Sequence, residues 1–152
     1  MKSLSRNSII PALLLAAVFT ACHKKKVVAD STPPSAVANG SIQAVKTDPG
    51  TDMTSTGAPY KLDSVTIKGN VLYLWVNYPG GCKDHSFELV SNGMYAKSLP
   101  PQLRLCLKHV NNGDMCKELI LNELKFDLSS VQYKGSSSMT ISIANKSINY
   151  NY

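Results

Sequence analysis

The sequence predicts an all-β protein, and three observations support this. Apolar and polar residues alternate with a period of two in most segments after residue 60, which is the period of a β-strand. Turn-forming Gly, Asn and Pro residues interrupt these segments at intervals of about ten residues. Seven Tyr residues and frequent Asn, Ser and Gly favour strands over helices. We therefore expect an immunoglobulin-like antiparallel β-sandwich of six to seven strands.

The N-terminus predicts a lipoprotein signal rather than a fold element. Lys2 and Arg6 precede the apolar run Ile9–Phe19, which has the layout of a signal peptide and is too short to span a membrane. The tetrapeptide Phe19-Thr20-Ala21-Cys22 follows and resembles the lipobox of bacterial lipoproteins, although Phe19 stands where Leu is usual. We expect a signal peptide over residues 1–21 and a lipidated Cys22 that anchors the mature chain in membrane lipid.

The residues after Cys22 bear on the orientation of the anchored protein. Lipoproteins of the Bacteroidota type that are displayed on the cell surface carry a Lys-plus-acidic signal at this point. This chain has Lys24-Lys25-Lys26 and no acidic residue before Asp30. The resemblance implies an outer-membrane anchor with the domain facing the periplasm, with surface display as the alternative. The three lysines could equally contact anionic head groups, at about 1 kcal/mol each.

The charge of the mature chain argues against a nucleic-acid partner. Removal of residues 1–21 takes away Lys2 and Arg6 and no acid, which leaves 14 basic and 10 acidic side chains, a net charge of +4. Three of these charges are the lysine run beside the anchor, so the folded part carries only scattered lysines. A nucleic-acid-binding face would need a compact basic patch. We expect membrane lipid and an envelope protein as partners.

Composition divides the mature chain into a tether and a domain. Residues 22–59 are rich in Ser, Thr, Pro, Gly and Ala and have no sustained apolar period, so they cannot bury enough surface to offset the entropy of ordering. We expect a disordered tether over residues 22–59 and a β-sandwich domain over residues 60–152. In the alternative interpretation, the weakly alternating segment Ser41–Val45 is a first strand.

The strands and turns of the domain follow from the alternation. Gly69-Asn70 is a two-residue hairpin signal between Leu62–Lys68 and Val71–Tyr78. Both faces of Val71–Tyr78 are apolar, which is typical of a strand buried on both sides or of one that lies between a sandwich core and a covered edge. Five further segments are predicted as strands: His85 to Leu89, Leu103 to His109, Ile120 to Leu128, Met139 to Ile143 and Ile148 to Tyr152. A short helix over Met115–Leu124 is an alternative.

The cysteines predict one disulfide. If Cys22 is lipidated, Cys82, Cys106 and Cys116 remain in a compartment that allows disulfides. Cys82 and Cys116 each follow a turn, Pro79-Gly80-Gly81 and Asn111 to Asp114 respectively, whereas Cys106 lies in the middle of a strand. We expect a Cys82–Cys116 bond, which would stabilise the fold by about 3–4 kcal/mol in the chain-entropy model.

A metal site is the competing hypothesis. Cys82-x-x-His85 and Cys106-x-x-His109 repeat one spacing, and Cys116 could add a third thiolate, which are donor types that zinc accepts. Residues three apart on a straight strand point to opposite faces, so Cys106 and His109 cannot converge without a bulge. A looser ligand site of His85, His109 and Asp114 is a further alternative. The simplest explanation makes His109 a core-edge histidine bonded to a backbone carbonyl and His85 a turn residue.

Motifs for catalysis do not stand out in the sequence. Cys-His nucleophilic chemistry needs a free thiolate beside a base, and Cys106 is predicted on the strand face opposite His109. The sequence shows no nucleophile elbow, no Gly-rich phosphate loop and no close pair of carboxylates. We therefore expect no catalytic residue and no cofactor.

One longer pattern resembles a known group of proteins. It comprises Gly80-Gly81-Cys82-x-x-His85-x-Phe87-x-Leu89, then Leu105-x-Leu107-x-His109 ahead of Asn112-Gly113-Asp114-x-Cys116, then Leu124-x-Phe126-Asp127-Leu128-Ser129. It is similar to small Bacteroidota lipoproteins with a NigD-like β-sandwich. The resemblance implies the fold, the envelope location and a family pattern that contains Cys82, His85, His109 and Cys116 but not Cys106. It implies no activity.

Two functional hypotheses follow. The first is a non-enzymatic, lipid-anchored interaction or structural module of the cell envelope. The second is a metal-binding, small-ligand-binding or enzymatic protein that uses the rim formed by Cys82, His85, His109 and Asp114.

Overall fold

The computed structural model describes residues 40–152, and these residues form an all-β sandwich. The predicted signal peptide, Cys22 and the chain up to residue 39 lie outside the described residues. The described chain contains nine strands and one short 3-10 helix: β1 Ile42–Ala44, β2 Lys46–Thr47, β3 Lys61–Lys68, β4 Val71–Gly80, β5 Ser86–Ala96, β6 Gln102–Val110, β7 Glu118–Asp127, η1 Ser129–Val131, β8 Ser138–Ile143 and β9 Lys146–Asn151.

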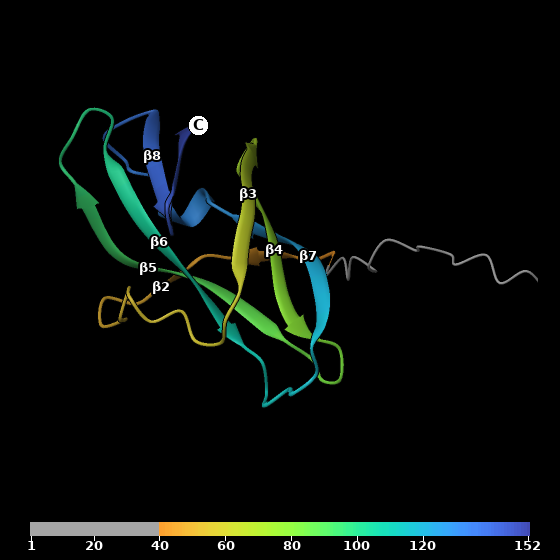
Figure 1. Ribbon diagram of the computed structural model, residues 1–152. Helices are drawn as coiled ribbons and strands as arrows, with labels where there is room; N and C mark the ends of the chain where they lie inside the picture. Colours follow the sequence, from red (N-terminus) through yellow and green to blue (C-terminus); the bar gives the residue numbers. More distant parts are fainter. Residues whose placement is uncertain (1–39) are drawn as a thin grey trace, which may run out of the picture. The chain divides into compact units, whose positions relative to one another are not determined.

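Two sheets pack face to face around one core. The first has the strand order β1-β7-β4-β3 and the second the order β2-β5-β6-β8-β9, and Figure 1 shows β3, β4 and β7 on one side and β5, β6 and β8 on the other. The inward side chains of alternate residues fill the space between them, as the period-two pattern predicts. The largest buried side chains include Leu72, Leu74, Leu89, Leu105, Leu107, Phe126 and Tyr150. The predicted all-β sandwich is confirmed.

The sheets are mixed rather than wholly antiparallel, and they contain nine strands where six to seven were predicted. β1 pairs with β7, β2 with β5 and β6 with β8 in parallel, while the remaining pairs are antiparallel. After β6 the chain passes through the opposite sheet as β7 before it returns as β8, and this double crossing lets β8 run in the same direction as β6. Parallel pairing without a helix is possible here because the second sheet supplies the crossover.

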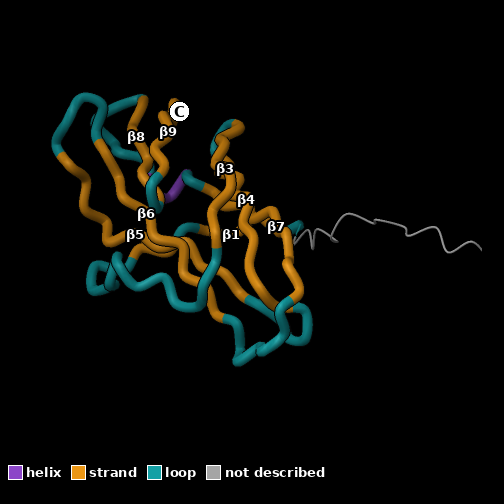
Figure 2. Tube along the Cα trace, viewed as in Figure 1, coloured by secondary structure: helices purple, strands orange, loops and turns teal. Residues whose placement is uncertain are grey.

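The domain begins earlier than Tyr60, so the predicted tether is wrong for residues 40–59. β1 extends the first sheet and β2 extends the second, and Val45 between them is buried in the core. A long loop follows between β2 and β3 (Figure 2), and it packs along β6: the Ala58 N–H donates to the His109 carbonyl and the His109 N–H donates to the Thr56 carbonyl, both at 2.8 Å. The alternative of a strand at Ser41–Val45 is the better prediction. Few apolar residues suffice because sheet-edge hydrogen bonds hold this segment.

The hairpin of β3 and β4 lies where Gly69-Asn70 predicts it, but only one face of β4 is buried. Leu72, Leu74 and Val76 point into the core, whereas Trp75 on the other face is 40% exposed. The prediction of burial on both faces is wrong because no further layer covers this sheet in the described part of the chain. The alternative of a helix over Met115–Leu124 is also wrong, because β7 pairs with β4 continuously from Glu118 to Asp127.

Candidate functional site

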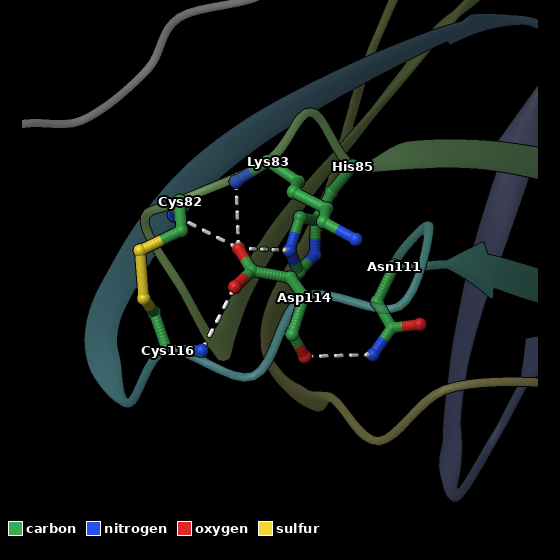
Figure 3. Close-up of a disulfide and its surroundings, with 6 residues drawn as sticks. All are labelled: Cys82, Lys83, His85, Asn111, Asp114 and Cys116. Atoms are coloured by element: carbon green, nitrogen blue, oxygen red, sulfur yellow. Dashed lines mark hydrogen bonds and ion pairs between the residues drawn. A yellow bond between two sulfur atoms is a disulfide. The ribbon is translucent and has the colours of Figure 1, made fainter.

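The candidate residues gather at one end of the sandwich, which we call the disulfide end. It consists of the β4–β5 loop, residues 81–85, and the β6–β7 loop, residues 111–117. Each loop carries the chain from one sheet to the other, so their joining closes this end. Cys82 and Cys116 form a disulfide with a Cα–Cα distance of 5.8 Å (Figure 3). The predicted pairing is the one that the structure contains.

Asp114 is the centre of the hydrogen bonds at this end. Its Oδ2 accepts the backbone N–H groups of Cys82 and Lys83, both at 2.9 Å, and its Oδ1 accepts that of Cys116 at 2.8 Å. Figure 3 shows the carboxylate enclosed by these groups. The hydrogen bond from Cys116, aided by those from Cys82, Lys83 and the His85 ring and opposed by burial, holds the pKa of Asp114 well below its usual range. Asp114 is therefore an ionised clamp that links the two loops.

His85 and His109 continue this network into the core. His85 Nε2 lies 3.2 Å from Asp114 Oδ2, and His85 Nδ1 lies 2.8 Å from His109 Nε2. His109 Nδ1 then faces the backbone carbonyls of Ala58 and Pro59 at 3.2 and 3.1 Å. Both imidazole rings are nearly inaccessible to solvent. The three predicted ligand residues are thus in contact, but in series rather than around one point.

The partners decide how many protons the two rings hold. Carboxylate and carbonyl oxygens only accept, so His85 Nε2 and His109 Nδ1 must each carry a hydrogen. The two facing nitrogens need one hydrogen between them, which makes three ring hydrogens for two imidazoles and hence one positive charge. Burial is the main effect that lowers the pKa of His109, with the charge of His85 adding to it.

Aromatic rings enclose the histidine pair. Tyr78 stacks on His85 with ring centroids 4.7 Å apart, and Phe87 stacks on His109 at 4.3 Å with an interplanar angle of 3°. Gly80 allows the close approach of the His85 ring to β4, because a Cβ at this position would lie 2.7 Å from His85 Nε2. Gly80 and Phe87 are part of the pattern seen in the sequence, but the contacts of these residues and of Tyr78 with the histidines were not predicted. The strand period could have predicted these contacts. Tyr78 is an even number of residues from Leu72 and Leu74 and so points into the core with them, and Phe87 lies two residues after His85 and so points to the same side.

The geometry does not fit the zinc hypothesis. Cys82 and Cys116 are joined to each other, so neither offers a thiolate, although both sulfurs lie near Asp114. Cys106 is buried on the outer side of β6, where its Sγ lies 3.6 Å from the Ser55 carbonyl oxygen. Burial raises the pKa of this thiol, which opposes formation of a thiolate. The chain that covers Cys106 is part of the segment expected to be a tether, so its burial was not predicted.

Within the described residues of this end, neither histidine has a free ring nitrogen for acid–base catalysis. Every ring nitrogen of His85 and His109 already faces a partner, whereas a general base must reach the proton that it abstracts. Beside the cluster lies a groove of about 530 Å³, which has the edge of His85 as one wall and is lined by Tyr78, Gly81, Cys82, Lys83, Asp84, His85 and Ile120. At the disulfide end, the two loops are therefore joined by a fully paired hydrogen-bond network, and an open polar groove lies next to it.

Comparison with solved structures identifies the fold. The chain is similar to a NigD-like immunity protein from Bacteroides caccae, with 19% identity and a TM-score of 0.51 over 72% of this chain and 59% of that one. A DUF1344 protein of unknown function from Bacteroides vulgatus follows, with 15% identity and a TM-score of 0.49 over 73% of this chain and 55% of that one. The chain thus spans less than two thirds of either protein.

No protein-family model and no curated protein sequence matches the chain. Residues 40–152 contain no helix with the length and apolar character of a membrane span. The likeness to the NigD-like immunity protein confirms, at the level of the fold, the resemblance predicted from the residue pattern: this domain has a β-sandwich fold similar to that of the NigD-like protein.

Proposed function

We propose that the protein is a lipid-anchored module of the cell envelope that binds a protein partner and has no enzymatic activity. The anchor rests on the lipobox-like sequence that ends in Cys22. The outer membrane with the domain facing the periplasm is the proposed location, because Lys24-Lys25-Lys26 replaces the Lys-plus-acidic display signal. The closed hydrogen-bond network of the disulfide end supports a non-enzymatic role.

The observation that carries the proposal is the outer face of the sheet β1-β7-β4-β3. Trp75, the single Trp of the chain, lies on this face together with Ile42 and Leu119, and all three are exposed. Tyr73 lies beside Trp75 between the ammonium groups of Lys68 and Lys125, which are 5.4 and 5.8 Å from its ring centroid. An aromatic centre with charged neighbours is the usual composition of a protein-binding hot spot.

The charges on this face favour a protein partner over a membrane. Glu123 pairs in register with Trp75 and forms an ion pair of 3.1 Å with Lys125. A face that carries both signs around an aromatic centre suits the mixed rim of a protein interface, whereas a membrane-binding face would have basic residues alone. An immunity role, as in the name of the NigD-like protein, is one form that such an interaction could take.

Site-specific crosslinking tests the interaction. A photo-crosslinking benzoylphenylalanine replaces Trp75 in the anchored protein in its own cells, and the same residue at Met115, which is 88% exposed away from this face, is the matched control. We expect one discrete protein adduct at position 75 that is absent at position 115. Identical adduct patterns at both positions, or no adduct at position 75, would contradict the proposal.

Metabolic labelling with a clickable palmitate tests the anchor separately. We expect the label on the full chain and its complete loss in Cys22→Ala, together with accumulation of the unprocessed precursor. Cys106→Ala is the matched control and should keep the label. Labelling that survives Cys22→Ala would rule out this cysteine as the site of lipidation.

A second candidate function is the binding of a small polar ligand in the groove beside His85. It is favoured by the size of the groove and by the loop groups of Lys83 and Asp84 that line it. Ligand screening by chemical-shift changes would place the largest shifts at residues 81–85. Full retention of binding after His85→Ala combined with His109→Ala would exclude the histidine rim from this role.

A further inference from the structure

The end of the sandwich opposite the disulfide exposes apolar side chains. It consists of the β5–β6 connection with the segment that faces it, residues 94–102 and 132–137, and we call it the hairpin tip. Leu99 is fully exposed and Met94 is 68% exposed. A groove of about 730 Å³ lies here, with Tyr95, Leu99, Pro101 and Tyr133 among its lining residues. Figure 1 shows the β5–β6 connection far from the β4–β5 loop, at the other end of β5.

The charges of the hairpin tip have one sign. Residues 94–102 and 132–137 contain Lys97 and Lys134 and no Asp or Glu. The disulfide end differs, because Asp84 and Asp114 lie there together with Lys83 and Lys117. A patch with exposed aliphatic side chains, tyrosines and only basic charges has the composition of a surface that contacts anionic lipid.

Hydrogen bonds between neighbouring segments support the hairpin tip. The Tyr95 hydroxyl donates to the Val131 carbonyl at 2.8 Å, and the Tyr95 and Tyr133 rings lie 5.2 Å apart. The Tyr152 hydroxyl accepts from the Tyr133 N–H and donates to the Tyr133 carbonyl, both at 3.0 Å. These contacts hold the two tyrosines that line the groove beside Leu99.

We propose that the hairpin tip docks on an anionic lipid bilayer, with Leu99 and Met94 entering the head-group region and Lys97 and Lys134 contacting lipid phosphates. This inference rests on the proposed anchor at Cys22, which would keep the domain at a high effective concentration near the membrane. The nineteen residues from Cys22 to Gly40 can span up to about 60 Å when extended, which leaves the domain room to turn the tip toward the surface.

Vesicle flotation of an unlipidated chain tests the docking independently of the anchor. The protein is residues 22–152 with Cys22→Ser, which retains every described residue and cannot be acylated. It is mixed at millimolar lipid with vesicles of phosphatidylglycerol and phosphatidylcholine, or of phosphatidylcholine alone. We expect flotation with the anionic vesicles that weakens as salt is raised. Failure of palmitate labelling would refute the anchor and leave this result intact.

Single substitutions test which residues of the hairpin tip contact the vesicle. We expect Lys97→Ala and Lys134→Ala to lower the partition coefficient about five-fold each, and Leu99→Ser to lower it about ten-fold. Met115→Ser is the matched control, because Met115 is 88% exposed at the disulfide end and should have no effect. Absence of flotation with anionic vesicles, or equal effects of Leu99→Ser and Met115→Ser, would overturn the proposal.

Discussion

The two ends of the sandwich are built in opposite ways. At the disulfide end, a covalent bond and a buried chain of hydrogen bonds from Asp114 through His85 to His109 satisfy the polar groups of both loops. At the hairpin tip, Leu99 and Met94 project into solvent and contribute little to the core. We infer from this difference that the disulfide end is held more firmly than the hairpin tip, which leaves the tip free to take on a binding role.

Removal of the disulfide is expected to have the largest effect on stability. Cys82→Ser combined with Cys116→Ser should lower the free energy of unfolding by about 3–4 kcal/mol, because the bond closes a loop of 34 residues. Chemical denaturation measures this. Cys106→Ala is the matched control and should cost about 1 kcal/mol. If the double variant lost no more than this control, the disulfide would not be the main support of this end.

Loss of the Asp114 charge should have the second largest effect on stability. In Asp114→Asn, one of the two side-chain oxygens is replaced by an NH₂ group, which cannot accept the backbone N–H groups that now point at it. We expect a clearly lower melting temperature than in Asp84→Asn, the control in the neighbouring loop. Equal melting temperatures of the two variants would show that the clamp contributes nothing beyond the disulfide.

The histidine pair should make stability depend on pH. The folded protein favours neutral His109, because its pKa lies below the ordinary value of 6.5. The resulting stabilisation is complete above pH 6.5 and is lost as the pH falls through the lowered pKa of the folded state. We expect the free energy of unfolding to decrease between about pH 7 and pH 5, and the slope to flatten in His109→Gln. An unchanged slope in that variant would assign the pH dependence to other groups.

Substitution at the hairpin tip should have the smallest effect on stability. Leu99→Ser replaces a fully exposed side chain, so the free energy of unfolding should change by less than about 0.5 kcal/mol. Denaturation of this variant beside the wild-type protein checks this. A larger loss would mean that Leu99 packs against the domain, and the contrast between the two ends would weaken.

Much of the disulfide end could be predicted because its residues are determined by local patterns. Cys82 and Cys116 follow recognisable turns, and the strand alternation places His109 on the core side of β6. Antiparallel pairing of Phe87 with His109 then brings His85 close. The order of contacts could not be predicted, because the acceptors for His109 are backbone carbonyls of Ala58 and Pro59, which any sequence would supply.

The first strands and the loop that covers Cys106 could not be predicted from the sequence, for a different reason. Residues 40–59 have the composition of a tether, and they are ordered by hydrogen bonds to the edges and flank of existing sheets rather than by their own apolar surface. Such pairing depends on backbone groups and has no side-chain period. The parallel pairing of β6 with β8 likewise depends on the path of β7 through the other sheet.

Intact-mass analysis tests the closed disulfide end most directly. The protein is the chain over residues 22–152 with Cys22→Ser, and its zinc content is measured in the native state. It is then denatured without reductant and treated with a thiol-alkylating reagent. Its intact mass and its peptide map are measured last. We expect one alkylated thiol at Cys106, a peptide that joins Cys82 to Cys116, and no stoichiometric zinc. Three alkylated thiols with one zinc per chain would contradict the clamp and would make the rim a metal site.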